Sequence, residues 1–258
     1  MTGPPAAEII AAFGGIGEPV ALPGGRGSSW RAGGIVLKPA DASDEELRWL
    51  ADELPQALVR VSRPLAAADG RPTVDGWMAV PYLHGAHRSG AWLDIVATGD
   101  ALHAALREHQ RPAFLDRRES RWAVADRAAW DDVPTVTTRP VPLLDRLRRL
   151  SRPVTLPHQL VHGDLTGNVL FAADAPPAVI DISLYWRPGD YAAAVVVADA
   201  LLWEGAHLAD LEPVLGRPGI GQLLVRALRF RLLADLLGHE DHVEAPYEEA
   251  VDIAAALA

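Results

Sequence analysis

The chain has 258 residues, of which 49% are hydrophobic and 22% are charged, and its formal net charge is −10. This length suits one large domain or two small lobes, and the composition is that of an ordinary soluble globular protein. The acidic charge argues against a nucleic-acid partner, and the absence of cysteine excludes disulfides, thiolate metal sites and cysteine nucleophiles.

The N-terminal residues contain no basic segment followed by an apolar one, so no signal peptide is predicted. No apolar run approaches the ~20 residues that a membrane span needs. The most apolar stretch, Tyr191 to Trp203, is interrupted by Asp199. We therefore expect a cytoplasmic protein without a membrane partner. The sequence does not indicate an oligomeric state.

The first third of the chain reads as a small strand-rich unit with one main helix. Ser43 or Asp44 is a candidate helix cap, and leucines at helical spacing follow it. The expected elements are a short helix over 6–13, a strand, glycine-rich turn, strand, turn and strand across 19–39, a helix from about 43 to 54, and strands over 57–61 and 77–82.

Helical patterns dominate from about residue 85 onwards. Proline and arginine accumulate between about 111 and 142, where we expect loops. The expected elements are helices over about 91–109, 143–150, 191–203, 220–237 and 247–257, and strands within 159–171 and 178–182. The sequence thus predicts an α+β fold with a small β-rich N-lobe (1–84), a hinge near 82–85 and a larger, mainly helical C-lobe (85–258).

Two residue types occur once each. Of the 24 basic residues only Lys38 is a lysine, and Asn168 is the single asparagine. A lone lysine is usually a solvated surface residue, but in this chain arginine supplies the surface charge. We therefore expect Lys38 and Asn168 to do something that Arg, Gln or Asp cannot do.

Three oxygen-bearing side chains stand at the ends of predicted strands. Asp164 directly follows one strand, Asn168 lies four residues on in a turn relaxed by Gly167, and Asp181 ends a second strand. Phosphoryl transfer from a nucleotide needs a proton acceptor, oxygen ligands for magnesium and a cation on the phosphates. Magnesium prefers hard oxygen ligands and completes its shell with phosphate oxygens. These residues, together with Lys38, offer that set.

The run His162-Gly163-Asp164-Leu165-Thr166-Gly167-Asn168, followed by Val179-Ile180-Asp181, resembles the catalytic loop and metal aspartate of the aminoglycoside phosphotransferase family. The resemblance implies the two-lobed architecture of protein kinases and magnesium-dependent phosphorylation of a small molecule by ATP or GTP. It also implies that Asp164 is the catalytic base and that Asn168 and Asp181 are the metal ligands. His162 would support the loop through hydrogen bonds.

Upstream segments resemble the nucleotide site of the same family, in the same order. Residues 24–29 resemble the nucleotide-covering loop, 36–38 the strand with the phosphate lysine, and 77–85 the strand and hinge that hold the adenine. Glu46, or less closely Glu45, resembles the helix partner of the lysine, although a first-turn acid also simply complements a helix dipole. The implied nucleotide-binding residues are Gly25, Arg26, Gly27, Ser28, Lys38, Glu46, Pro81 and Tyr82.

The chain departs from the family pattern in three places. The family usually has five steps between the catalytic Asp and the Asn, whereas Asp164 to Asn168 is four. The metal segment reads Asp181-Ile182-Ser183 rather than Asp-Phe-Gly. No anchor like Ala-Pro-Glu follows, which argues against a protein kinase. The segment 184–190 either shapes the substrate side or packs Tyr185 and Trp186 beneath the catalytic loop.

The charge of the C-terminal part is relevant to the class of acceptor substrate. Residues 204–258 contain ten Asp or Glu and four Arg, which either solvate helix faces or favour cationic, amino-bearing acceptors by electrostatic steering. Aminoglycosides and amino sugars are the acceptors that the resemblance suggests. The alternative is a weak or inactive kinase-like protein that binds nucleotide as a sensor or scaffold. The cluster His239 to His242 is expected to be a surface helix end rather than a metal site.

Overall fold

The structure, a computed structural model, describes residues 3–23, 27–55, 59–134, 141–238 and 247–258. The chain divides into two compact units. Unit 1 consists of residues 1–86 and 170–181, and unit 2 consists of residues 87–169 and 182–258. The segment 170–181, which lies within the predicted C-lobe, therefore belongs to the same compact unit as the N-terminal strands.

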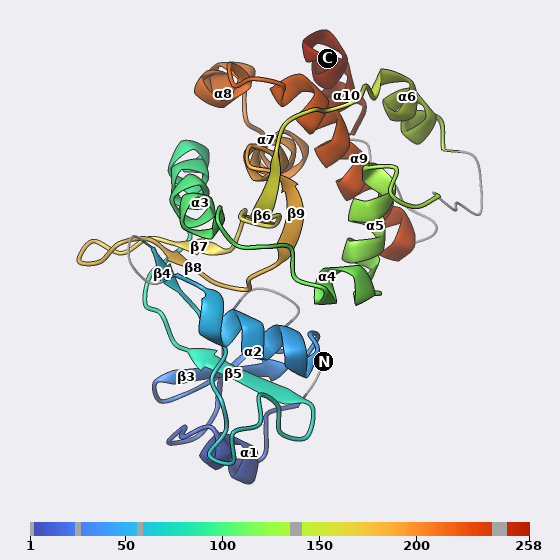
Figure 1. Ribbon diagram of the computed structural model, residues 1–258. Coiled ribbons are helices and arrows are strands. Elements are labelled where there is room, and N and C mark those ends of the chain that lie inside the picture. The colour runs from blue at the N-terminus through green and yellow to red at the C-terminus, as the bar shows by residue number, and fades with distance from the viewer. Residues whose placement is uncertain (1–2, 24–26, 56–58, 135–140, 239–246) are drawn as a thin grey trace. The chain divides into compact units, whose positions relative to one another are not determined.

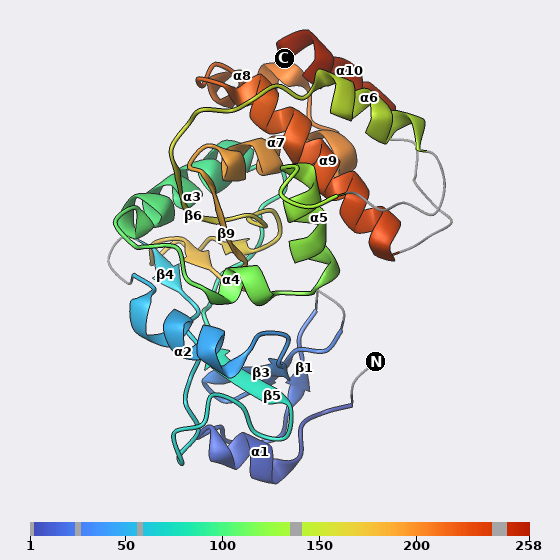
Figure 2. The ribbon, with the colours of Figure 1, turned by 45° about the vertical axis from the view of Figure 1, so that its right-hand side comes forward.

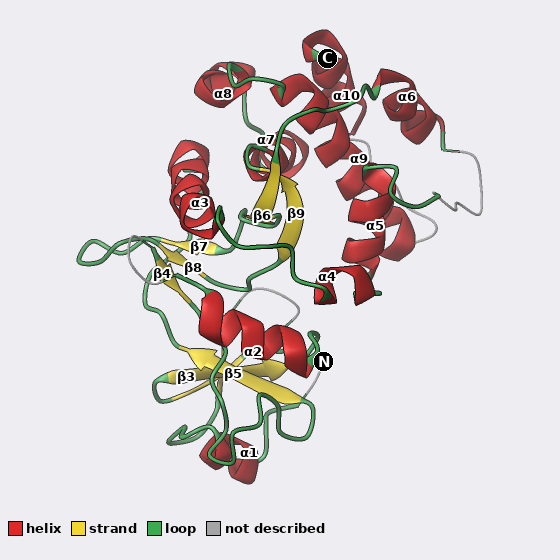
Figure 3. Ribbon diagram, in the orientation of Figure 1, coloured by secondary structure: helices red, strands yellow, loops and turns green. Residues whose placement is uncertain are grey.

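An antiparallel sheet with one helix on each face forms unit 1 (Figures 1 and 3). Side chains alternate along the central strand, so Ile35 and Leu37 pack with the first helix while Val36 packs with the second. The helices are α1 (Ala7–Ala12) and α2 (Asp44–Glu53), and the strands, in sheet order, are β1 (Val20–Ala21), β2 (Trp30–Ala32), β3 (Ile35–Pro39) and β5 (Trp77–Pro81).

Helix α2 begins where the sequence predicts. Ser43 is its N-cap, and the Ser43 Oγ accepts a hydrogen bond of 3.2 Å from the backbone N–H of Glu46. Leu47 and Leu50 are buried, and Leu47 packs with Met78 and Val80 of β5. The predicted cap and leucine spacing are confirmed, and they fix which face of α2 meets the sheet.

A second, small sheet explains why 170–181 belongs to unit 1. Its strands, in order across the sheet, are β4 (Arg60–Val61), β8 (Ala178–Val179) and β7 (Val169–Leu170). Strand β4 pairs in parallel with β8, so that Arg60 lies opposite Ala178 and Val61 opposite Val179. The segment that leads into Asp181 is thereby anchored to the N-terminal part of the chain.

Helices dominate unit 2, and two of them were not predicted in the stretch 111–142, where the expectation of loops was wrong. Helix α5 is capped by Ser120, and its buried positions are mainly alanines, which give only a weak helical pattern. Helix α8 was also missed. The helices are α3 (Trp92–Leu106), α4 (Phe114–Arg117), α5 (Arg121–Ala129), α6 (Pro142–Leu150), α7 (Tyr191–Trp203), α8 (Leu208–Leu215), α9 (Ile220–Gly238) and α10 (Tyr247–Leu257).

Helices α7 and α9 form the centre of unit 2, and α9 runs beside α5, α7 and α10 (Figures 1 and 2). Nearly every side chain of α7 is buried, as expected for a helix that is apolar on all sides. Asp199 is the buried acid within it, and α9 carries three buried arginines, Arg226, Arg229 and Arg231. Buried charges of this kind need partners.

Two antiparallel strands, β6 (His158–His162) and β9 (Leu184–Pro188), complete unit 2. His162 lies opposite Leu184, so the residues just after β6 meet the residues just before β9. The sequence did not predict β9 as a strand. Among the described residues, no helix is long and apolar enough to cross a membrane.

Candidate active site

The loop between β6 and β7 begins with a glycine that no other residue can replace without a clash. The Gly163 N–H donates to the carbonyl of Ser183 at 3.0 Å, which holds the loop against the start of β9. A Cβ on Gly163 would lie 2.6 Å from the ring of Tyr185, closer than real Cβ contacts allow. The buried Tyr185 ring therefore supports the backbone immediately before Asp164.

Two buried histidines support the same loop. His162 is fully buried, and its Nδ1 accepts a hydrogen bond of 3.2 Å from the Asp164 N–H. The backbone N–H of His162 donates in turn to Nε2 of His103 on α3, at 2.9 Å. Burial, with a smaller contribution from His162, lowers the pKa of His103 to about 3, so His103 is a neutral acceptor at pH 7. His162 has the structural role that the sequence suggested.

The shortened spacing from Asp164 to Asn168 is accommodated by a tight turn. The Asn168 N–H donates to the carbonyl of Leu165 at 2.9 Å, which closes a four-residue β-turn. Gly167 occupies the third position of this turn with a φ of +78°, a conformation that glycine adopts at little cost. The glycine thus allows the chain to reach Asn168 in four steps.

The turn brings Asn168 onto Asp164. The Asn168 Nδ2 donates to the backbone carbonyl of Asp164 at 2.7 Å and to its Oδ2 at 3.3 Å. Because the amide nitrogen faces Asp164, the amide Oδ1 points the other way and remains a potential ligand for a cation. The structure therefore joins two of the predicted site residues within unit 2.

Arg231 of α9 is a site residue that sequence reasoning missed. Its Nη2 donates to the Asp164 Oδ1 at 2.8 Å, and the Asp164 side chain remains 42% exposed. Arg231 also forms a buried ion pair with Asp199. A signal was present in the sequence: Asp199 interrupts an otherwise apolar helix, and a buried carboxylate needs a cation.

Two further predicted site residues, Lys38 and Asp181, meet within unit 1, a pairing that the sequence did not predict. The Lys38 Nζ donates to the Asp181 Oδ1 at 2.5 Å. Lys38 follows Leu37 on β3 and therefore lies on the α2 side of the sheet. Asp181 has a φ of +49°, which is uncommon for a residue with a side chain and suits asparagine or aspartate best. Strand pairing at β8 holds the chain just before this bend.

The structure describes some of the remaining predicted nucleotide-site residues and not others. Glu46 is buried in the first turn of α2, and its pairing with Lys38 stays a prediction. Gly27 and Ser28 lie in the connection between β1 and β2, while Gly25 and Arg26 lie outside the described residues. The last two residues, Pro81 and Tyr82, come at the end of β5: Pro81 lies opposite Ile35, and the Arg31 guanidinium covers the Tyr82 ring at 3.7 Å.

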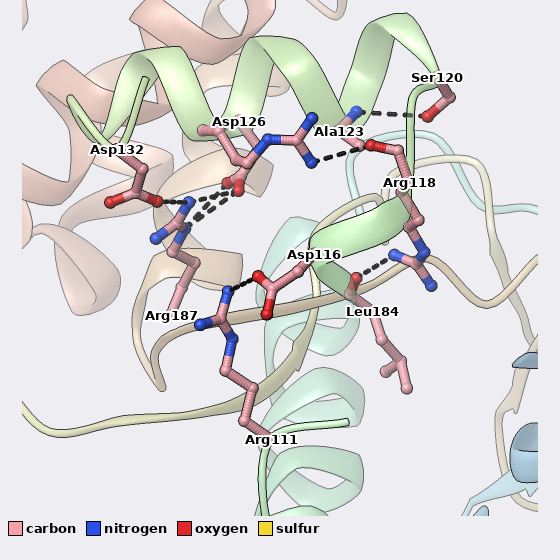
Figure 4. Close-up of polar contacts among 10 residues, drawn as sticks. Arg111, Asp116, Arg118, Ser120, Ala123, Asp126, Asp132, Leu184 and Arg187 are labelled. Carbon is pink, nitrogen blue, oxygen red and sulfur yellow. Dashed lines mark hydrogen bonds and ion pairs between the residues drawn. The ribbon is translucent and has the colours of Figure 1, made fainter. Parts of the chain in front are cut away.

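A pocket of about 320 Å³, open to solvent, lies beside β9 in unit 2. Tyr185 and Trp186 both line it, and Tyr185 also packs against Gly163 in the loop between β6 and β7. That the segment 184–190 shapes the substrate side stays a prediction. The charged lining of the pocket is mostly arginine, and each arginine already contacts an acidic side chain or a carbonyl oxygen (Figure 4). The arginines are Arg111, Arg118, Arg127 and Arg187.

No cluster of three or more His, Asp or Glu side chains that could hold a metal occurs in the described part of the chain. The cluster His239 to His242 lies outside it.

Comparisons with known proteins fit this description. Residues 34–185, more than half of the chain, match the Phosphotransferase enzyme family (APH). The chain therefore belongs to this family, and the matched stretch contains Lys38, Asp164, Asn168 and Asp181. No curated protein sequence matches the chain.

Solved structures show the same two-lobed, protein-kinase-like fold. An aminoglycoside phosphotransferase from Alicyclobacillus acidocaldarius is 16% identical, with a TM-score of 0.58 and coverage of 100% of this chain and 93% of that one. The aminoglycoside phosphotransferase APH(4)-Ia, solved with AMP-PNP and hygromycin B, is 14% identical, with a TM-score of 0.63 and 97% coverage of both chains. A choline/ethanolamine kinase family protein from Mesorhizobium loti is 16% identical, with a TM-score of 0.55 and coverage of 97% and 90%.

Proposed function

We propose that this protein is a small-molecule kinase that moves the terminal phosphoryl group of a nucleotide to a hydroxyl group. The observation that carries the proposal is the loop around Asp164: a partly exposed carboxylate, held at one oxygen by Arg231 and beside the amide of Asn168. The family match over 34–185 supports it. A nucleotide-binding N-lobe (1–84) and a catalytic C-lobe (85–258) belong to the same proposal.

Asp164 would act as the proton acceptor. As the acceptor hydroxyl oxygen forms its bond to the γ-phosphorus, the bond from that phosphorus to the β,γ-bridging oxygen breaks, and the nucleoside diphosphate leaves with the electron pair. The hydroxyl proton passes to Asp164. A carboxylate suits this task because it has lone pairs beyond those that Arg231 and Asn168 engage.

Lys38 would hold the nucleotide phosphates. An ammonium group is a compact point charge that binds phosphate oxygens well, and this lysine is the only one in a chain with 23 arginines. Its contact with Asp181 places a cation next to a carboxylate on the α2 side of β3. Glu46, Gly25, Arg26, Gly27, Ser28, Pro81 and Tyr82 complete the proposed nucleotide site.

The available donors fit magnesium. The Asn168 Oδ1 faces away from Asp164, and the Asp181 carboxylate is half-exposed, so one amide oxygen and one carboxylate are accessible as hard ligands. Magnesium, when bound, would neutralise charge on the phosphates. Asn168 and Asp181 would hold it, with phosphate oxygens and water as further ligands.

The acceptor would be a small hydroxyl compound. Hygromycin B is bound in one structural neighbour, and another belongs to a choline/ethanolamine kinase family, so both chemistries belong in a test panel. Aminoglycosides and amino sugars also suit the acidic 204–258 segment. The pocket beside β9 is not the expected place for a cationic group, because four guanidinium groups line it.

Nucleotide binding can be tested first by thermal unfolding with magnesium and a non-hydrolysable analogue of ATP or of GTP. Binding raises the apparent stability by mass action, and the nucleotide with the larger shift identifies the donor. Lys38→Ala should lose most of this shift, whereas Asp164→Asn should keep it. Arg48→Ala is a suitable control, because Arg48 on α2 is exposed and its guanidinium donates a hydrogen bond to the Gly70 carbonyl.

Turnover can then be measured by mass spectrometry of phosphorylated acceptors, with hygromycin B, choline, ethanolamine and glucosamine as the panel. The expected result is transfer to at least one acceptor that disappears in Asp164→Asn. Magnesium-independent nucleotide binding without any transfer would instead favour the sensing or scaffolding alternative, for which the shortened loop is the structural reason.

A further inference from the structure

A buried ion pair lies directly behind the catalytic loop. Arg231 of α9 and Asp199 of α7 meet through two hydrogen bonds, Nε to Oδ1 and Nη2 to Oδ2, both of 2.6 Å. Their side chains are 5% and 2% exposed. This two-point geometry fixes the plane of the guanidinium group relative to helix α7.

The pair extends to the loop through one nitrogen. The Arg231 Nη2 that donates to Asp199 also donates to the Asp164 Oδ1 at 2.8 Å. A guanidinium Nη carries two hydrogens, so each hydrogen serves one carboxylate. The position of the Asp164 oxygen is therefore tied to a group that α7 and α9 hold in place. We call Arg231, Asp199 and Asp164 the loop bridge.

The charges of the loop bridge are costly to bury. Burial raises the pKa of Asp199, and Arg231 opposes that rise. Burial also works against the charge on Arg231, but Asp199 and Asp164 together raise the Arg231 pKa well above its usual range. Apolar side chains of similar volume often stabilise a core as well as a buried ion pair does. The presence of two buried charged groups beside a partly exposed third therefore suggests a role other than stability.

On the basis of the proposed function, we infer that Arg231, fixed by Asp199, is a positioning residue for the proposed base Asp164. It holds Oδ1 against the protein and thereby leaves Oδ2 to meet the acceptor hydroxyl. The Asn168 amide, 3.3 Å from Oδ2 and 2.7 Å from the Asp164 carbonyl, limits rotation from the other side. Arg231 and Asn168 would thus set the direction of the carboxylate from two sides.

The test compares Arg231→Lys with Arg187→Lys. Lysine keeps the charge but cannot reproduce a planar, two-point contact, so each variant disrupts one buried arginine bridge. Arg187 is a matched control because it pairs with the buried Asp126 in the same way, and its guanidinium donates to Asp126 and Asp132 rather than to residues 163–168. The reaction measured is ADP formation from magnesium-ATP, alone and with hygromycin B.

We expect Arg231→Lys to lower kcat about 10- to 100-fold with little change in the KM for ATP, because misplacing a reacting group by about 1 Å can cost that much. Arg187→Lys should leave both constants near wild type. The double variant Asp164→Asn/Arg231→Lys should be no slower than Asp164→Asn alone, since Arg231 acts through Asp164. Unchanged kcat in folded Arg231→Lys, or full additivity in the double variant, would overturn the inference.

A crystal structure of Arg231→Lys gives a readout that does not depend on turnover. The expected result is an Asp164 carboxylate rotated from its wild-type position, with the Gly163–Ser183 and Asn168–Leu165 hydrogen bonds intact. An unchanged carboxylate contradicts the inference. Arg231→Met replaces the lysine variant if that does not fold. Wild-type turnover that survives in Asp164→Asn would instead contradict the proposed function.

Discussion

Unit 2 contains two arginine bridges of the same construction. In the loop bridge, Arg231 joins Asp199 and Asp164; in what we call the β9 bridge, Arg187 joins Asp126 and Asp132 (Figure 4). In both, a single Nη2 donates to a buried carboxylate at 2.6 Å and to a more exposed one at 2.8 Å.

The two bridges also match in burial. The arginines are 5% and 7% exposed, the inner carboxylates 2% and 6%, and the outer carboxylates 42% and 45%. What differs is the backbone around the outer carboxylate. Asp164 follows Gly163 and precedes a tight turn that carries Asn168, whereas Asp132 follows the end of α5. The same ion-pair arrangement thus occurs at two places in unit 2. The backbone around the outer carboxylate, and not the ion pair, distinguishes the proposed catalytic position from the other.

Neutralising the outer carboxylates should produce the largest difference in turnover between variants of the two bridges. Asp164→Asn is expected to lower turnover about 10²- to 10⁴-fold, the usual contribution of a general base. Asp132→Asn, a substitution at nearly the same exposure, should leave turnover unchanged and cost at most about 1 kcal/mol of unfolding free energy. Steady-state ADP formation by both variants in the presence of the acceptor checks this. Equal losses of turnover in the two variants would contradict the proposed difference in function between the bridges.

Truncating the inner carboxylates should lower the free energy of unfolding to a similar extent at the two bridges. Asp199→Ala and Asp126→Ala each leave a buried guanidinium without its main partner, and each should lower the free energy of unfolding by about 3–5 kcal/mol. Urea denaturation measures this loss directly. A much smaller loss in Asp199→Ala than in Asp126→Ala would show that the two pairs are not energetically equivalent.

Tyr185 connects the two regions, because it lies two residues before Arg187 on β9 and packs on Gly163. Gly163→Ala would place a Cβ 2.6 Å from its ring, and the overpacking should cost about 1–3 kcal/mol together with a loss of turnover. Gly189→Ala is the matched control, since its Cβ would meet Gln159 at an ordinary 3.6 Å. The unfolding temperature and the rate of ADP formation should both remain near wild type in that control.

The support beneath the loop should depend on pH. The pKa of buried His103 is lowered from 6.5 to about 3, so the unfolded state binds one more proton than the folded state between these values. Stability is therefore fully present above about pH 7 and is lost as the pH falls, by up to about 1.4 kcal/mol per pH unit.

Urea denaturation of wild type and His103→Gln between pH 7 and pH 5 tests this expectation. The variant should show the shallower dependence of unfolding free energy on pH. The titratable groups that act on His103, namely His162 and Asp100, remain in both proteins, so the difference in slope reports His103 itself. Parallel curves would show that His103 is not the titrating group.

Much of this molecule follows from local sequence. The Ser43 cap, the leucine spacing of α2 and the apolar length of α7 gave these elements nearly their observed bounds. Local signals also pointed to Gly167, since a four-residue path to Asn168 needs a positive φ that glycine adopts readily. Periodicity failed at α5, where small alanines face the core, and at β9, which is short and buried on most positions.

Long-range pairing is what only the tertiary structure decided. The parallel pairing of β4 with β8 puts the segment before Asp181 in unit 1, although more than a hundred residues separate the strands. Arg231 lies 67 residues from Asp164 and 32 from Asp199. The sequence shows that an acid inside α7 and arginines inside α9 need partners, because buried charges are costly. It contains no local pattern that says which partner each one finds, since that depends on how the helices pack.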